Sequence, residues 1–294
     1  MNEPIIEIKN LVREFGAKRA LDNVSLSIQP GTVMGLVGEN GAGKTTLIKH
    51  VLGLLKAQSG SVSVFGLDPV ANPESVLSRI GYLSEEGDLP TWMKVHELMR
   101  YSAAFYSTWD DAYAMKLLEE FKLDPGAKLS KMSKGQRSRV GLLVAMAYRP
   151  QLLVLDEPSS GLDPIVRKDI LGAIIRTIAD DGRTVLFSSH LLSEVERVAD
   201  QISMVKNGKI LLSDSLDNVK DSHYRATFLF EKPLAAHPTI EGSLTWSGGG
   251  REWHGMFVGD LSQVDTVVAT MGAQVVERAH LSLEEIFVAR VGAA

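Results

Sequence analysis

Residues 38–46 read Gly38-Glu39-Asn40-Gly41-Ala42-Gly43-Lys44-Thr45-Thr46, and this stretch decides the fold. It follows an apolar run, Val33 to Val37, and it precedes an apolar pattern that predicts a helix over Lys44 to Leu55. The three glycines let successive backbone N–H groups point inward, and the helix adds the positive end of its dipole. All nine residues are therefore predicted to cradle the phosphates of a nucleoside triphosphate.

Two residues of this phosphate loop have distinct chemical roles. Lys44 is expected to reach the β and γ phosphates, and the Thr45 hydroxyl is expected to hold Mg²⁺. The alternative is an ordinary glycine-rich turn before a helix. The bare pattern arises by chance in roughly one chain of this length in a hundred, so triphosphate binding is the favoured interpretation.

Composition restricts the class of protein. The 294-residue chain has a net charge of -5 and no cysteine, which excludes disulfides and thiolate zinc sites. The longest apolar stretch, Val140 to Tyr148, is too short to cross a bilayer, and the N-terminus lacks a signal-peptide pattern. We expect a cytoplasmic protein without direct membrane insertion. No basic block is present, which argues against a nucleic-acid partner.

The order of predicted elements is a β-rich start, a helical insert and an α/β core. Short strands with turn signals fill the first third, and helical periodicity takes over from Thr91 to about Tyr148. Strands over Leu152 to Leu155 and Thr184 to Ser188 then alternate with helices, which is typical of a parallel sheet.

A second unit begins after about Asp214. Its strands are expected at Ala226 to Phe230, Leu244 to Trp246 and Trp253 to Val258. Ser247-Gly248-Gly249-Gly250 is expected to be a hairpin loop, and a helix is expected over Leu261 to Met271. Ser282 and Glu285 form a capping box that starts the last helix.

Two carboxylates follow the strand Leu152 to Leu155. Asp156 and Glu157 would lie at the carboxyl edge of the sheet, beside the phosphate loop. Asp156 is predicted to support Mg²⁺, while Glu157 orients and deprotonates the water that attacks the γ phosphate. An ordinary acidic turn is the alternative, and the phosphate loop upstream disfavours it.

The segment Leu152 to Pro164 (LLVLDEPSSGLDP), the phosphate loop and Met132-Ser133-Lys134-Gly135-Gln136 together resemble the ATP-binding subunit of an ABC transporter. The resemblance covers about the first 215 residues. It implies an α/β fold: a P-loop NTPase core of the ABC ATPase type with an antiparallel β-subdomain and a helical subdomain, plus a small α+β C-terminal domain. The ATPase domain would span residues 1–215, with the helical insert at about 88–148, and the accessory domain residues 216–294.

The stretch Ser133, Lys134, Gly135 and Gln136 corresponds to the family signature, L-S-G-G-Q. In the family, this signature begins a helix that points at the γ phosphate of ATP bound by the other subunit. Lys134 replaces a glycine and adds a positive charge. Ser133 with Gln136 is equally a plain capping box.

The resemblance assigns four more positions. Asp163, in Ser160-Gly161-Leu162-Asp163, belongs to the D-loop that crosses the dimer, and His190 is the switch histidine that acts with Lys44 and Glu157 in catalysis. Phe15 either stacks on adenine or packs in the core. Glu85 stands where the family commonly has glutamine, and we interpret it as a variant γ-phosphate sensor close to Mg²⁺.

The ending Leu281 to Val288 resembles the C-terminal extension of ATPases that serve drug, lantibiotic, sodium and polymer exporters, and dimerisation is its expected role. The implied function is ATP binding and hydrolysis, with Mg²⁺, that drives dimerisation and powers export through separate transmembrane permease subunits. The second ATPase subunit is expected to be a copy of this chain, although a heteromeric pair stays open. The implied location is the inner face of the plasma membrane.

Two other functions remain to be weighed. A nucleic-acid or ribosome-associated ABC ATPase usually carries tandem cassettes, long coiled coils or zinc modules, and none is visible in the sequence. A degenerate regulatory subunit is disfavoured by the intact Lys44, Asp156, Glu157 and His190. Several aromatic residues of the insert either dock a helix of the membrane partner or pack the insert's own core: Trp92, Tyr101, Phe105, Tyr106 and Trp109.

Overall fold

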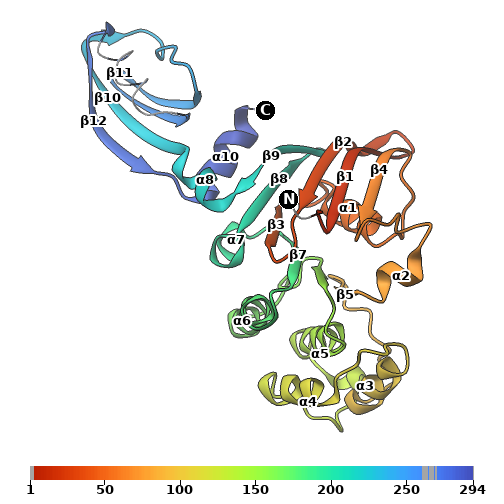
Figure 1. The fold of residues 1–294 in the computed structure, drawn as a ribbon. Helices are drawn as coiled ribbons and strands as arrows, with labels where there is room; N and C mark the ends of the chain where they lie inside the picture. The colour runs from red at the N-terminus through yellow and green to blue at the C-terminus, as the bar shows by residue number, and fades with distance from the viewer. Residues whose placement is uncertain (1–2, 260–263, 265–267, 269, 294) are drawn as a thin grey trace. The chain divides into compact units, whose positions relative to one another are not determined.

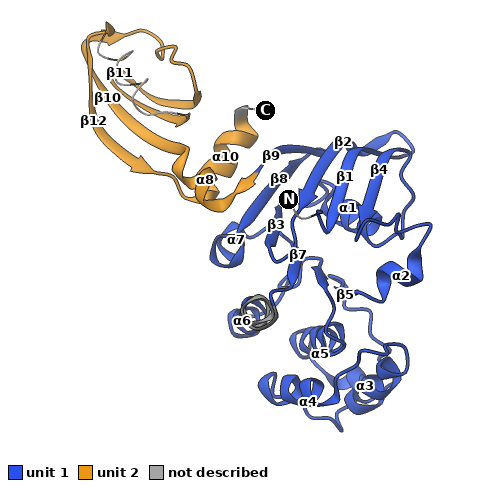
Figure 2. Cartoon of the chain, viewed as in Figure 1, with its two compact units in different colours: residues 1–213 blue, residues 214–294 orange. Residues whose placement is uncertain are grey.

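The computed structural model describes residues 3–259, 264, 268 and 270–293 (Figure 1). The chain forms two compact units, residues 1–213 and 214–294 (Figure 2). The unit boundary lies two residues before the domain boundary expected from the sequence. Along the first unit, the elements are β1 (Ile6–Phe15), β2 (Lys18–Ile28), β3 (Val33–Val37), α1 (Lys44–Val51), β4 (Ser59–Val64), α2 (Pro73–Leu77), β5 (Ile80–Leu83), α3 (Val95–Ala103), α4 (Asp111–Glu120), a 3₁₀ turn (Leu129–Lys131), α5 (Lys134–Ala147), β6 (Leu152–Leu155), α6 (Pro164–Asp181), β7 (Thr184–Ser189), α7 (Leu192–Val198), β8 (Gln201–Lys206) and β9 (Lys209–Ser215), which ends inside the second unit.

A six-stranded sheet in the order β5-β6-β7-β3-β8-β9 forms the centre of the first unit. Strands β5, β6, β7, β3 and β8 pair in parallel, and β3, β6 and β7 are buried along their whole length. Because the carboxyl ends of parallel strands meet at one edge, the segments that follow β3, β6 and β7 converge there. These segments are the phosphate loop, the acidic pair and the loop that contains His190.

A three-stranded antiparallel sheet, β2-β1-β4, forms the β-rich start. Phe15 pairs with Lys18 across the two-residue turn Gly16-Ala17, so both side chains lie at the tip of this hairpin. Helices α3, α4 and α5 form the helical insert (Figure 1). The expected α/β class with an antiparallel β-subdomain and a helical subdomain is confirmed.

The helix after the phosphate loop is shorter than the sequence pattern predicts. It ends at Val51 rather than Leu55, because Gly53 adopts a left-handed φ of 69°. A Cβ at Gly53 would collide with the Pro69 carbonyl. Glycine one position past the helix cap is a common way to end a helix.

The second unit contains α8 (Leu216–Asp221), β10 (His223–Leu234), β11 (Ser243–Val258), β12 (Ala273–His280) and α10 (Leu283–Ala293). Its sheet has the order β11-β10-β12 and packs Phe228, Phe230 and Phe257 in its core. The capping box of Ser282 and Glu285 is present at the start of α10. Most of the helix predicted over 261–271 lies outside the described residues.

The hairpin loop predicted at Ser247–Gly250 is confirmed. The segment labelled β11 contains both arms of this hairpin: the Val258 N–H donates to the Gly242 carbonyl at 2.9 Å, and a Cβ at Gly248 would stand 2.5 Å from the Glu252 carbonyl oxygen. The chain therefore reverses between Gly248 and Glu252, where Gly248 and Gly250 have positive φ values. The second arm pairs with β10, with Glu252 facing Leu229.

Across the described ranges 3–259 and 270–293, with 264 and 268, no helix has both the length and the apolarity that a membrane crossing requires.

Candidate active site

The phosphate loop joins the end of β3 to the start of α1. Gly43 caps the helix with a φ of 117°, and a Cβ there would stand 2.6 Å from the Ala20 carbonyl oxygen. Only glycine fits this combination of left-handed backbone and close approach. The N-terminus of α1 is consequently open toward the loop, as anion binding requires.

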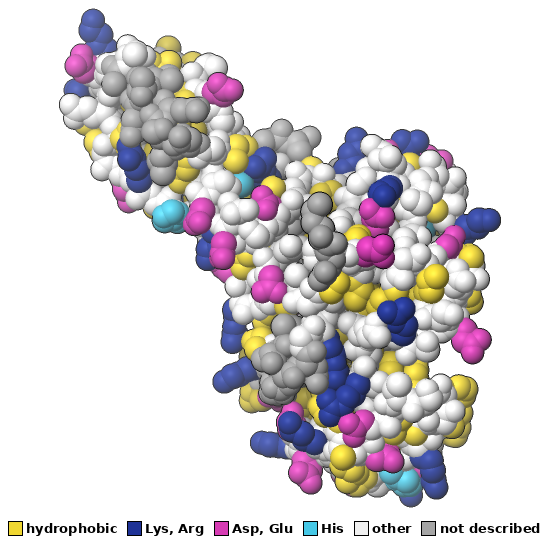
Figure 3. Space-filling view, in the orientation of Figure 1, with side chains coloured by type: hydrophobic (Ala, Val, Ile, Leu, Met, Phe, Trp, Pro, Cys, Tyr) yellow, Lys and Arg dark blue, Asp and Glu magenta, His cyan; other side chains and the backbone are white. Residues whose placement is uncertain are grey.

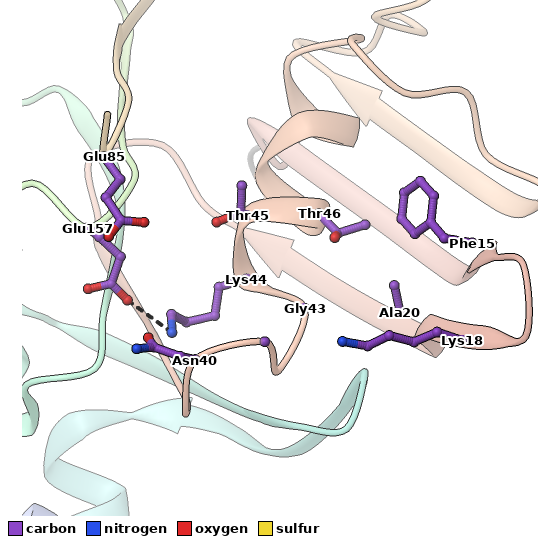
Figure 4. Close-up of a pocket in the computed structure, with 11 residues that line it drawn as sticks. Phe15, Lys18, Ala20, Asn40, Gly43, Lys44, Thr45, Thr46, Glu85 and Glu157 are labelled. Carbon is purple, nitrogen blue, oxygen red and sulfur yellow. Dashed lines mark ion pairs between the residues drawn. The ribbon is translucent and has the colours of Figure 1, made fainter. Parts of the chain in front are cut away.

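Lys44 lies at the centre of the site. Its ammonium donates to the carbonyl oxygens of Gly38 and Glu39, at 2.7 and 3.2 Å, and its Nζ lies 3.0 Å from Oε1 of Glu157. Only 5% of either side chain is exposed. Two opposite buried charges thus neutralise each other beside the phosphate loop (Figure 4).

Glu157 also contacts His190. The Nδ1 of His190 lies 2.7 Å from Oε2 of Glu157, so a proton on Nδ1 makes a charge-assisted hydrogen bond. The His190 backbone N–H donates to the same oxygen at 3.4 Å. Lys44, Glu157 and His190 therefore form one continuous chain of contacts, with Glu157 in the middle.

The backbone of Glu157 is strained. Its φ is 48°, a left-handed value that a non-glycine residue adopts at a free-energy cost. The Glu157 N–H donates to the Ser188 hydroxyl at 2.8 Å, and that hydroxyl donates to Oδ1 of Asp156 at 2.7 Å. Ser188, the second-last residue of β7, thereby holds the acidic pair in this conformation.

Asp156 is buried beside Thr45. Burial raises the pKa of Asp156, while hydrogen bonds from Ser188 and Thr45 act in the opposite direction. The Thr45 hydroxyl and the Asp156 carboxylate are hard oxygen donors at the mouth of the phosphate loop. Mg²⁺ is typically held by one or two such groups together with phosphate oxygens, so this donor set fits it.

A pocket of about 350 Å³ connects the phosphate loop to the β1–β2 hairpin. Phe15 lines it with 47% of its surface exposed, so this ring does not pack in the core. Phe15 and Lys18 lie on the far side of the loop from Glu157 (Figure 4). The other lining residues are Ala20, Asn40, Gly41, Gly43, Lys44, Thr45, Thr46, Glu85 and Glu157.

Glu85 lines the same pocket, and its Oε1 accepts a hydrogen bond from the Ser160 hydroxyl at 3.1 Å. Its negative charge contributes to the raised pKa of Asp156. Glu85 thus connects the pocket to the D-loop segment that follows Glu157.

The signature residues lie elsewhere. Ser133 and Gln136 cap α5: the Ser133 N–H donates to Gln136 Oε1 at 2.9 Å, and the Gln136 N–H donates to Ser133 Oγ at 3.2 Å. Lys134 places its Nζ 3.2 Å from where a Cβ of Gly161 would stand. Among the described residues, none of 133–136 lines the pocket.

Asp163 caps helix α6. Its Oδ1 accepts hydrogen bonds from the backbone N–H groups of Ile165 and Val166 at 3.0 and 3.1 Å. Like 133–136, it is not among the pocket's lining residues in the described chain.

Two residues of the site were missed from the sequence. Ser188 could have been noticed as a polar residue at the end of an apolar strand. Lys18 had a weaker signal: its Nζ lies 3.8 Å from where a Cβ of Gly41 would stand, and only the hairpin geometry brings it there.

Comparison with known proteins identifies the family of this chain. The family described as ABC transporter matches residues 21–160. The lantibiotic transport ATP-binding protein SrtF of Streptococcus pyogenes is 33% identical over 232 residues, which is 78% of this chain and 99% of SrtF. This chain belongs to the ABC transporter ATP-binding proteins. As a member of this family, it binds ATP and hydrolyses it.

Similarity to this family also extends beyond the first unit. The uncharacterized ABC transporter ATP-binding protein YhaQ of Bacillus subtilis is 30% identical over 299 residues, covering 98% of this chain and 99% of YhaQ. A solved structure described as the ATP-binding subunit of an ABC transporter aligns with a TM-score of 0.68 and 30% identity. It covers 74% of this ABC ATPase and 92% of the solved chain.

Proposed function

We propose that this ABC ATPase powers export through separate transmembrane permease subunits, as one half of an ATPase dimer on the inner face of the membrane. The observation that carries the proposal is the chain of contacts from the buried Lys44 and Glu157 to the more exposed His190 at the phosphate loop. The similarity to SrtF, a lantibiotic transport ATP-binding protein, supports a role in transport.

Hydrolysis follows from this geometry. Lys44 leaves Glu157 for the β and γ phosphates when the triphosphate enters, which frees the Glu157 carboxylate. Glu157 takes a proton from water as the water oxygen attacks the γ phosphorus, and the bond to the bridging oxygen of ADP breaks. His190 keeps Glu157 oriented through the hydrogen bond at Nδ1.

Mg²⁺ is the metal we assign to this site. Thr45 and Asp156 would hold it, with Glu85 within reach through bound water. When bound, the ion supplies charge neutralisation at the phosphate oxygens.

The adenine end of ATP is assigned to the β1–β2 hairpin. Phe15 offers an exposed aromatic face for stacking, at the end of the pocket opposite Glu157. The nine residues Gly38–Thr46 then enclose the phosphates between the two ends.

A second subunit completes the site. Ser133, Lys134, Gly135 and Gln136, which start α5, and Asp163, at the start of α6, are the parts that we assign to the γ phosphate and the D-loop contact of the opposite subunit. We take the second subunit to be another copy of this chain, since it carries both halves of the site.

The helical insert provides a surface for the permease. An apolar groove of about 550 Å³ runs between β5 and α5, and its lining includes Leu54, Tyr82 and Val144. Trp92 and Phe105 of the insert are about two-thirds exposed, whereas Tyr106 stacks on Tyr148. The exposed aromatic residues, rather than Tyr106, are the ones we assign to a helix of the membrane partner.

A nucleic-acid function has less support. On the face shown in Figure 3, basic and acidic side chains of the described residues are interspersed in each unit. A net charge of -5 agrees with this distribution. Nucleic-acid binding depends on clustered positive charge.

The proposal is tested by purifying the tagged chain from membranes in mild detergent. We expect a multi-span membrane protein to accompany it, and we expect Lys44→Ala to abolish ATP hydrolysis by the complex. The exposed Lys56, changed to alanine, is the control and should leave hydrolysis intact. Recovery of ribosomes or DNA in place of a membrane protein would contradict the proposal.

A further inference from the structure

A buried carboxylate lies outside the phosphate pocket and connects to both sides of it. Glu194 belongs to α7, and only 4% of its side chain is exposed. Its Oε2 accepts a hydrogen bond from Ser159 Oγ at 2.6 Å and another from Ser189 Oγ at 3.0 Å. One oxygen atom thus joins two segments that are 30 residues apart in the sequence.

The two serines flank the reacting pair. Ser159 follows Glu157 by two residues, and Ser189 directly precedes His190. The two segments that meet in the 2.7 Å contact between Glu157 and His190 are thus also joined through Glu194, in addition to the pairing of β6 with β7. A displacement of about 1 Å at reacting groups can lower a rate by about a hundredfold.

The other carboxylate oxygen of Glu194, Oε1, is connected to the D-loop through Arg167. Oε1 lies 3.2 Å from Nε of Arg167, and an Nη of Arg167 donates to the Leu162 carbonyl at 3.4 Å. Leu162 is next to Asp163 in the D-loop. Glu194 therefore contacts the start of the D-loop through Ser159 and its end through Arg167.

A carboxylate in this place is costly, because burial removes it from water. Apolar packing between α7 and the sheet would have needed no charge. The groups that contact the Glu194 carboxylate are two buried hydroxyl donors and one guanidinium. Such directional contacts fix the positions of the segments that carry them.

We propose that Glu194 is a positioning residue for ATP hydrolysis, which holds Glu157 and His190 in register and ties both to the D-loop. The inference rests on the proposed roles of Glu157 and His190. It predicts a loss of turnover without a loss of nucleotide affinity, because Glu194 is not among the residues that line the described pocket.

Steady-state hydrolysis by the full chain tests the inference, with thermal unfolding measured for each variant. Glu194→Ala, Ser159→Ala and Ser189→Ala should each lower kcat by about tenfold or more, with the KM for ATP within about twofold. Glu194→Gln keeps an acceptor oxygen for both hydroxyls and should recover most of that loss. Ser193→Ala, which changes an exposed serine of the same helix, is the matched control and should keep the wild-type kcat.

A double substitution provides a second test of the inference. Ser189→Ala added to Glu194→Ala should cause little further loss, since both substitutions break the same contact. Unchanged kcat in Glu194→Ala alongside a lower melting temperature would overturn the inference and leave Glu194 a packing residue. A rise in KM that matches the fall in kcat would overturn it as well.

A different result would refute the proposed function. If Glu157→Gln still hydrolyses ATP, Glu157 is not the base, whatever Glu194 does. If Glu157→Gln is inactive and Glu194→Ala is fully active, only the positioning role is refuted.

Discussion

Lys44 and Glu157 form a buried ion pair, and Glu157 also contacts His190 at 2.7 Å. A buried ion that loses its partner is strongly destabilising. In the mechanism we propose, a bound triphosphate gives Lys44 new anionic partners, and Lys44 then leaves Glu157. We therefore expect the Glu157 carboxylate to be available as a base only when ATP is bound.

A substitution at Lys18 tests whether the nucleotide site extends to the tip of the β1–β2 hairpin. Lys18 lines the pocket together with Phe15 and the phosphate loop, and we expect its ammonium to lie near the α phosphate and ribose of a bound nucleotide. We expect Lys18→Ala to weaken ATP binding by about twofold to fivefold, as for a solvent-exposed ion pair, and to leave kcat unchanged. Titration calorimetry measures the affinity. Arg19→Ala is the control, because Arg19 pairs with Glu14 and Asp22; equal affinity in wild type and Lys18→Ala would remove Lys18 from the site.

Residue types that carry chemistry were readable from the sequence, since Lys44, Thr45, Asp156 and Glu157 occur in compact local patterns. Glu194 and Lys18 were not. Glu194 depends on Ser159, which is 35 residues away, and a lone glutamate in a helix has no pattern that distinguishes it from a solvated one. Contacts between distant segments are decided by packing, which a single sequence does not display.

Among the helices, α5 begins at a residue to which we assign two roles. Ser133 caps the helix, and it is also the first residue that we assign to the partner's γ phosphate. Ser133→Ala should cost about 1 kcal/mol in unfolding free energy, the usual value of a lost N-cap. It should also lower ATP hydrolysis well beyond the effect of that destabilisation.

Ser215 offers a matched control for this prediction. Ser215 caps α8 with a bond of the same length, 3.2 Å from Asn218 N to Ser215 Oγ. Ser215→Ala should have a similar cost in stability, measured by denaturant unfolding, and no effect on hydrolysis. Equal ATPase rates in the two variants would leave Ser133 with a capping role alone.

The start of β10 carries a buried histidine whose pKa affects the stability of the second unit. Burial lowers the pKa of His223 from its usual value of 6.5, and the neighbouring Arg290 adds to the effect. His223 Nδ1 lies 2.7 Å from the Val219 carbonyl oxygen and 3.1 Å from Ser222 Oγ, while its Nε2 accepts from Arg290 at 3.0 Å. The folded unit therefore holds neutral histidine.

Below pH 6.5 the unfolded chain binds a proton that the folded chain does not, so unfolding free energy falls as the pH falls from 6.5 toward the lowered folded pKa. Denaturant unfolding at pH 7.5 and 5.5 should show this loss, and His223→Gln should reduce it. The exposed His280, changed to glutamine, is the control and should leave the loss unchanged. An identical pH dependence in His223→Gln and wild type would contradict the assignment.

Local patterns predicted some elements well and others poorly. The capping boxes at Ser133 and Ser282 depend on residues three apart and are present. The Ser247–Gly250 loop is present as well, because a glycine-rich turn between two apolar runs is also a local signal. The end of α1, by contrast, comes four residues before the predicted Leu55, because it depends on the approach of Pro69 to Gly53.

At the scale of the whole molecule, each unit has its own hydrophobic core, which suggests that the first folds without the second. A chain of residues 1–215 keeps β9 complete. We expect it to bind ATP as the full chain does but to dimerise more weakly, since dimerisation is the role we assign to the second unit. Light scattering with ATP present measures this, and equal dimer fractions in the two chains would refute that role.

We propose that Glu157 is the base of a site that only two subunits complete. Light scattering measures the mass of Glu157→Gln with Mg²⁺ and ATP, and again with ADP. We expect a dimer with ATP, a monomer with ADP and no release of phosphate. A monomer in both nucleotides, or phosphate release at the wild-type rate, would contradict it.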